Sequence, residues 1–252
     1  MTHLEALFTP ADFGALSQRD LGSTVCVVFD VLRATSSMVT ALDHGAEAIL
    51  PVETIPEALA ARQRRPDVVL AGERDGVRIQ AELTGSIAFD LGNSPREFTR
   101  ERVAGRTIVM TTTNGTRALR ACAAAKMVLA SSFLNLGATA EFIERERPSQ
   151  LLLVCSGTFE EAAYEDVLGA GALCELLWAS FRDGKVADSA RMARDLFLLA
   201  DADLAEALAR SRNGGRLLGR PELKDDVAFC LRRDGAPLVA ELNRQGLVRK
   251  RV

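Results

Sequence analysis

Histidine and aromatic residues are scarce in this chain of 252 residues, which has two histidines, one tryptophan and one tyrosine. With only His3 and His44 available, the sequence argues against a zinc or iron site built from imidazole ligands. The five cysteines stand singly, at Cys26, Cys122, Cys155, Cys174 and Cys230. Scattered cysteines without a CxxC pair are typical of reduced core thiols, so we expect a cytoplasmic protein without disulfides.

Long apolar runs, a basic start and an excess of one charge are also missing. No stretch approaches the ~20 apolar residues of a membrane span, and Met1–Glu5 lacks the pattern of a signal peptide. The net charge is −3, whereas a nucleic-acid binder needs a basic stripe to neutralise phosphates. We therefore expect neither a membrane nor a nucleic-acid partner. A homo-oligomer is compatible with the sequence, which gives no size for it.

Short apolar runs alternate with helical patterns, which indicates βαβ units. Strands are predicted at 25–29, 48–52, 68–71, 107–110, 127–130 and 151–154, and helices at 36–44, 55–64, 115–124, 136–145 and 159–180. Pro51 in the second strand favours an edge strand or a bulge. The pattern predicts an α/β fold of three layers around a mostly parallel sheet.

Equivalent strands recur along the chain at an offset of about 80 residues. This repetition predicts one α/β unit over residues 1–252, built from two similar βαβαβ halves at 22–100 and 104–182. A helical C-terminal extension is predicted at 185–252. The alternative is that two ordinary α/β stretches happen to share this spacing.

Charged and hydroxyl side chains follow the first predicted strand. Asp30 stands at its tip, then Arg33, and then Ser36 at the start of a helix. Ligands of open α/β sheets bind beyond the carboxyl ends of the strands, and a helix N-terminus with a nearby arginine suits a phosphate. These three residues are therefore candidates for the site. The alternative is a simple N-cap with a local Asp30–Arg33 pair.

The strand at 107–110 is followed by a second polar turn rich in threonine. Its candidate anion-binding residues are Thr113, Asn114, Gly115, Thr116 and Arg117. Asn-Gly favours a tight turn that directs successive N–H groups inward as an anion nest. A polar turn with an N-cap would explain this segment alone. Two such loops at equivalent strand ends instead predict two anion-binding edges of one cleft.

Carboxylates near strand and helix ends are the candidate metal ligands. Glu73 ends the third predicted strand, Glu165 and Asp166 lie in the long helix predicted from 159, and Asp226 precedes an apolar run. Asp166 falls on a small, apolar helix face, where a carboxylate is costly unless it meets a cation or a donor. Oxygen ligands suit Mg²⁺. We predict Asp30, Glu73, Glu165, Asp166 and Asp226 as the ligand set, with solvated or capping acids as the alternative.

Motifs of other phosphate-transfer designs are missing. Asp30-Val31-Leu32 is not the DxD pair of aspartyl-phosphate enzymes, and Cys155 has no arginine at the sixth place after it. Neither histidine has an Arg-His-Gly context, and no GxxxxGK[ST] loop is present. The pattern that remains indicates metal-activated water attacking a phosphoryl group held by arginine.

Five stretches in this order resemble the 2-phosphosulfolactate phosphatase family. They are Asp30 to Ser36, Gly92-Asn93-Ser94-Pro95, Thr112 to Thr116, Ser156 to Asp166 with Ala170-Gly171, and Asp226-Val227. Together they cover most of the chain. The resemblance implies a magnesium-dependent hydrolase that removes phosphate from 2-phospho-3-sulfolactate, a step in coenzyme M biosynthesis.

The same resemblance assigns roles to residues. It implies Asp30, Asp166 and Asp226 as catalytic carboxylates, and it adds Asn93 and Ser94 to the substrate-binding set. A substrate that carries phosphate, carboxylate and sulfonate suits a cleft with two anion-binding loops. Two alternatives stay open, a noncatalytic sensor of an anionic metabolite and a phosphotransferase with an acceptor other than water.

Overall fold

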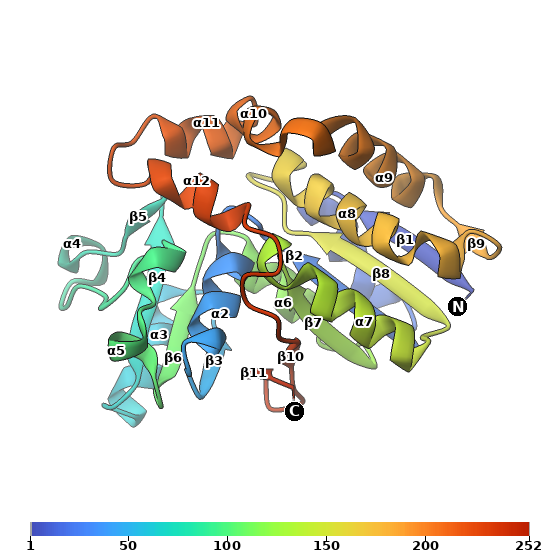
Figure 1. Cartoon of the computed structure of the whole chain (residues 1–252). Helices are drawn as coiled ribbons and strands as arrows, with labels where there is room; N and C mark the ends of the chain where they lie inside the picture. Colours follow the sequence, from blue (N-terminus) through green and yellow to red (C-terminus); the bar gives the residue numbers. More distant parts are fainter. Residues whose placement is uncertain (1, 252) are drawn as a thin grey trace.

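The computed structural model describes residues 2–251 (Figure 1). Its strands are β1 His3–Leu7, β2 Thr24–Phe29, β3 Ala48–Pro51, β4 Val69–Arg74, β5 Val77–Arg78, β6 Thr107–Thr111, β7 Met127–Ser131, β8 Gln150–Cys155, β9 Lys185–Val186, β10 Ala240–Leu242 and β11 Val248–Lys250. Its α-helices are α1 Pro10–Gly14, α2 Ala34–Asp43, α3 Ile55–Arg64, α4 Ala81–Thr84, α5 Arg100–Val103, α6 Gly115–Ala121, α7 Leu136–Glu146, α8 Tyr164–Phe181, α9 Asp188–Ala200, α10 Leu204–Ala209, α11 Arg212–Leu218 and α12 Lys224–Cys230.

The strands form one sheet in the order β5-β4-β6-β3-β11-β10-β7-β2-β8-β1-β9. Its pairs are parallel except those made by β5, β10 and β11. Helices pack on both faces of the sheet (Figure 1). The predicted three-layer α/β class with a mostly parallel sheet is therefore confirmed. Within residues 2–251, no helix has the length and apolar character that crossing a membrane requires.

All six predicted strands and all five predicted helices are present, and most have shifted ends, whereas α3 has the predicted bounds. The largest shift is at α8, which begins at Tyr164 rather than near residue 159. Phe159 and Glu160 have φ of 53° and 65°, and this left-handed backbone cannot begin a right-handed helix. Strand β1 was not predicted, because its five residues mix half-buried polar and buried apolar side chains.

The prediction of an edge strand at Pro51 is wrong, because β3 lies inside the sheet between β6 and β11. Pro51 is the last residue of β3. Strand β11 pairs with β3 only at Ile49, so the missing proline N–H breaks no bond of that ladder. A proline is tolerated inside a sheet at such a position.

The strands of the two predicted halves are interleaved. On one side β6 lies between β4 and β3, and on the other side β2 lies between β8 and β7. In the first group, β6 of residues 104–182 lies between two strands of residues 22–100. In the second group, β2 of residues 22–100 lies between two strands of residues 104–182. This exchange fits a repeated unit, but the repeat itself stays a prediction. Neither 22–100 nor 104–182 packs as a separate body.

The C-terminal extension is helical only as far as Cys230, which corrects the prediction of a helical segment over 185–252. The chain descends from α12 and ends in the β10–β11 hairpin, which joins β7 to β3 in the sheet (Figure 1). The turn between the two strands ends at Gly246, with φ of 75°. A glycine in this conformation favours a hairpin over a continuous helix.

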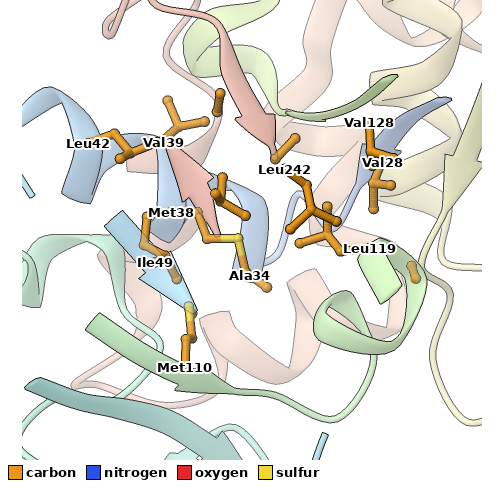
Figure 2. Close-up of a cluster of buried hydrophobic side chains, with 14 of the residues drawn as sticks. Val28, Ala34, Met38, Val39, Leu42, Ile49, Met110, Leu119, Val128 and Leu242 are labelled. Carbon is orange, nitrogen blue, oxygen red and sulfur yellow. The ribbon is translucent and has the colours of Figure 1, made fainter. Parts of the chain in front are cut away.

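Both faces of β2 are buried, as its uninterrupted apolar sequence predicts. Cys26 and Val28 face a cluster that includes α2 and α6, whereas Val27 and Phe29 face α7, α8 and α9. Figure 2 shows the first cluster, in which Met38 of α2 lies close to the side chains of neighbouring strands. This packing holds the N-termini of α2 and α6 beside the tip of β2.

Candidate functional site

The loops after β2, β4, β6 and β8 line one pocket with a volume of about 190 Å³. Asp30 follows β2, Glu73 lies near the end of β4, Asn114 follows β6, and Asp166 lies in the first turn of α8. The segment between α11 and α12 adds Arg220 from above. The structure therefore brings together polar side chains that follow strands far apart in the sequence, as the strand-end rule predicts.

Asp30 is buried at the tip of β2 and caps the next helix. Its Oδ1 accepts a hydrogen bond of 3.0 Å from the backbone N–H of Ala34. Burial raises the pKa of Asp30 to about 6, and the negative charges of Glu73 and Glu165 act in the same direction. The alternative of a local ion pair with Arg33 is not seen, because that arginine pairs with another carboxylate.

Asp166 joins the loop after β2 to the loop after β8. Its Oδ1 accepts from the backbone N–H of Val31 at 2.8 Å, and its Oδ2 accepts from Ser156 Oγ at 3.0 Å and from the N–H of Gly157 at 3.2 Å. Burial raises the pKa of Asp166 well above its ordinary value, and the charge of Asp30 is the next cause. Two buried acids whose pKa values are both raised favour a proton or a cation near them.

Glu165 leaves one oxygen without a partner. Its Oε1 accepts from Asn213 Nδ2, whereas its buried Oε2 and the buried Oδ1 of Asn93 have no hydrogen-bond partner in the described chain. Both residues line the pocket, and burial raises the pKa of Glu165. Orphaned oxygens of this kind are the donors that a hard cation uses.

No three His, Cys, Asp or Glu side chains within residues 2–251 form a ready-made metal cage. Mg²⁺ does not require one, since it usually binds one or two carboxylates and completes its shell with water and substrate phosphate. The orphaned Glu165 Oε2 beside the desolvated Asp166 carboxylate provides donors of that kind. The residues present therefore fit Mg²⁺.

Glu73 is occupied with local contacts. Its Oε1 accepts from the N–H and the Oγ1 of Thr113, each at 2.9 Å, and its Oε2 accepts from the N–H of Gly76 at 2.7 Å. These bonds use both donors of Thr113, so the loop after β6 is held by a carboxylate of the protein itself. In the same turn Asn114 lines the pocket with no such bond to Glu73.

Asp226 lies outside the pocket and completes a buried charge network. Its Oδ2 pairs with Arg33 at 2.8 Å, while its Oδ1 accepts from Ser94 Oγ at 2.7 Å and from Arg96 Nε at 2.9 Å. The carboxylate is fully buried. This corrects the expectation that Asp226 joins Asp30 around one ion, because its charge is already met by two guanidinium groups and it does not line the pocket.

Three further candidates also lie away from the pocket lining. Ser36 Oγ donates to the carbonyl oxygen of Val31 at 2.8 Å, and Thr116 Oγ1 donates to that of Thr112 at 3.2 Å. Arg117 lies on the surface and pairs with a glutamate of the loop after β8 at 3.0 Å. The two hydroxyls shape the helix starts, so they support the site through the backbone.

Gly115 lets the two helix starts approach each other. A Cβ there would lie 2.6 Å from Asp30 Oδ2 and 2.7 Å from Ala34 Cβ. We expect Gly115→Ala to lower the free energy of unfolding by about 1–3 kcal/mol and to reduce activity by displacing Asp30. Urea denaturation measures the first effect. Gly14→Ala is the control, since nothing lies within 4 Å of a Cβ there; equal stability of both variants would contradict the account.

The pocket also contains residues that the sequence did not single out. Arg74 follows Glu73 in β4, and Asn213, Arg216 and Arg220 come from α11 and the turn after it. Asn213, Arg216, Leu217 and Arg220 are spaced three or four residues apart, as on one helix face, although Arg220 lies just beyond the end of α11. This spacing could have indicated from the sequence that these residues lie on one face. It does not show what that face covers.

The chain matches one protein family over most of its length. Residues 14–245 match the family model described as 2-phosphosulpholactate phosphatase. The chain is 38% identical over 227 residues to a probable 2-phosphosulfolactate phosphatase of Caldicellulosiruptor saccharolyticus, covering 88% of this chain and 90% of that protein. A Deinococcus radiodurans protein of the same name is 40% identical, with 86% and 87% covered.

A third relative spans almost the whole chain. The probable 2-phosphosulfolactate phosphatase of Caldanaerobacter subterraneus subsp. tengcongensis is 36% identical over 247 residues, which covers 96% of this chain and 97% of that protein. The residues matched by the family model, 14–245, contain every pocket loop described above. The chain therefore belongs to the 2-phosphosulfolactate phosphatase family.

Proposed function

We propose that this protein is a magnesium-dependent phosphatase that hydrolyses 2-phospho-3-sulfolactate, or a related phosphorylated hydroxy acid, to sulfolactate and phosphate. One observation carries the proposal: the buried carboxylates of Asp30 and Asp166 share a small pocket with several arginines. Family membership and the names of the relatives support the same substrate. A pocket of about 190 Å³ suits a small metabolite.

Asp30 is the proposed proton acceptor. Its Oδ1 is engaged by the N–H of Ala34, which leaves Oδ2 as the oxygen that takes a proton from the attacking water. A base whose pKa lies near 6 is mostly ionised at neutral pH and still basic enough to accept that proton. Burial keeps the carboxylate out of bulk water, so its basicity is retained.

Asp166 and Glu165 are the residues that would hold Mg²⁺, with Asp30 and Asn93 on the same lining. The bound ion would neutralise phosphoryl charge and activate a water molecule. Arg33 enters the pocket from the start of α2, fixed by Asp226 on one nitrogen and by the carbonyl oxygen of Gly76 on the other. A guanidinium held in this way is oriented in advance to bind an anionic substrate.

The direct test is release of inorganic phosphate by the purified protein. We expect release from 2-phospho-3-sulfolactate with MgCl₂ and its loss with EDTA. Adding alcohol acceptors should leave the yield of free phosphate unchanged, which separates hydrolysis from phosphotransfer. If no phosphate appears from this substrate or from a panel of phosphorylated hydroxy acids, the proposed function is wrong.

Magnesium is also expected to stabilise the protein. An ion that binds only the folded state adds about 2.7 kcal/mol at 100 times its Kd, so MgCl₂ should raise the Tm of the wild type. Glu165→Gln and Asp166→Asn should reduce this shift, because each removes a negative ligand from the pocket. Differential scanning calorimetry with MgCl₂ or EDTA measures it. An equal shift in both variants and the wild type would exclude these residues as ligands.

A further inference from the structure

Arg220 is the arginine of the pocket whose charge is not engaged by the protein. Arg33 pairs with Asp226, and Arg216 pairs with Asp75 at 3.6 Å. Arg74 donates to the carbonyl oxygen of Glu73 and to the hydroxyl of Thr111. Within the described part of the chain, Arg220 makes no ion pair and no side-chain hydrogen bond, although it lines the pocket. A half-buried cation without a protein partner is available for a ligand anion.

The surroundings of Gly76 show that two cations converge here. A Cβ at Gly76 would lie 3.9 Å from Arg220 Nη1 and 4.0 Å from Arg33 Nη2. Two guanidinium groups this near one point repel each other unless an anion lies between or beside them. The glycine keeps that space free of a side chain, and its φ of 77° fits the tight turn after β4.

The pocket lining contains charged groups of both signs. Desolvated carboxylates lie where β2 and β8 end, at Asp30, Glu165 and Asp166. Arg216 lines the pocket from α11, where it pairs with a protein carboxylate, and Arg220 lines it from the turn that follows. A phosphoryl group bound with Mg²⁺ belongs beside the desolvated carboxylates, because they need positive charge. The unpaired Arg220 suits an anionic group that does not react.

We infer that Arg220 forms a second anion subsite that binds the non-reacting acidic group of the substrate, a sulfonate or a carboxylate. The inference rests on the proposed function for the orientation of the substrate, but the subsite itself can be tested without turnover. Phosphate monoesters with a further acidic group should be substrates, and esters without one should be poor. Arg220 would then determine specificity.

Binding of the phosphate-free product tests the subsite alone. Isothermal titration of 3-sulfolactate should give a Kd about 10- to 100-fold weaker for Arg220→Gln than for the wild type, the loss expected for a charge-assisted contact. Arg210→Gln is the matched control, because that arginine is exposed and pairs only with Glu206, four residues earlier. The control should bind like the wild type. Absence of binding by the wild type, or equal Kd for Arg220→Gln, would overturn the inference.

Turnover of three substrates tests specificity separately. We expect Arg220→Gln to lower kcat/KM for 2-phospho-3-sulfolactate by about 10- to 100-fold, and to change that for isopropyl phosphate by less than about threefold. A loss that spares 2-phospholactate would assign the subsite to sulfonate, and a loss that extends to 2-phospholactate would assign it to carboxylate. An equal loss for all three would overturn the inference. Failure of the wild type on every substrate would instead reject the proposed function.

Discussion

Replacing Asp30 by asparagine is expected to lower kcat for phosphate release by about 100- to 10,000-fold, the contribution typical of a positioned general base. Asparagine has nearly the same shape and still offers an oxygen to the N–H of Ala34, but it cannot accept a proton from water. The measurement is steady-state phosphate release with saturating MgCl₂. Asp225→Asn serves as the control, since Asp225 is exposed outside the pocket. A variant of Asp30 with wild-type kcat would remove this residue from the mechanism.

The same substitution should stabilise the metal-free protein at pH 8. Burial raises the pKa of Asp30 from 3.8 to about 6, so the folded state binds this proton more tightly than the unfolded state. Its contribution to stability is fully present below about pH 4 and is lost as the pH rises through about 6. A shift of about two units corresponds to about 3 kcal/mol.

Urea denaturation in EDTA checks the sign. The free energy of unfolding of Asp30→Asn should exceed that of the wild type by about 1–3 kcal/mol at pH 8, and the difference should shrink towards pH 4. Adding MgCl₂ should also narrow the gap at pH 8, because a cation stabilises the ionised wild-type carboxylate. A wild type that is more stable than the variant at pH 8 in EDTA would contradict the assigned burial cost.

Asp226→Asn is expected to be the most destabilising of the substitutions considered. It removes the negative charge that meets Arg33 and Arg96, and Arg33 is itself almost fully buried. Breaking a buried pair from one side costs about 3–5 kcal/mol, because the remaining charge is left without compensation. Activity should fall as well, since Arg33 loses the partner that orients it in the pocket.

Asp225 provides the matched comparison for this prediction. It neighbours Asp226 and pairs with the same Arg96, at 3.0 Å, but its side chain is 60% exposed. Asp225→Asn should therefore change the free energy of unfolding by less than about 1 kcal/mol. Urea denaturation of both variants gives the two values side by side. Similar losses of unfolding free energy in the two variants would contradict the larger cost assigned to breaking the buried ion pair.

The loops at the strand tips could be predicted from the sequence because neighbouring residues in the chain determine them. An apolar run followed by Asp30 and Arg33 marks the end of a buried strand, and parallel strands bring such ends to one edge. The pocket position of Asn114 followed from the same rule. The sequence does not show which group pairs with each carboxylate. That pairing decides whether the carboxylate is free to bind a metal or a substrate.

Asp226 illustrates this limit. It precedes an apolar run like other candidate acids, yet its partners Arg33 and Arg96 lie 193 and 130 residues away along the chain. Pairing over such separations depends on how α12 packs against the rest of the fold. Arg220 was missed for the same reason, because a helix-face pattern does not show which pocket the face covers.

The fold was predicted best where the apolar run was nearly uninterrupted, as in β2, β6 and β8. The short strands β1, β10 and β11 contain three to five residues with polar side chains among them, so their pairing depends on neighbours in the sheet. Interleaving of the two halves was likewise invisible, since equal spacing along the chain is compatible with separate or exchanged halves.

A crystal structure with 3-sulfolactate and Mn²⁺, which accepts the same oxygen ligands as Mg²⁺, would locate metal and ligand together. We expect an anomalous metal peak beside Asp166 and Glu165, with an acidic group of the ligand against Arg220. A metal bound at Asp226, or a ligand outside this pocket, would contradict this expectation.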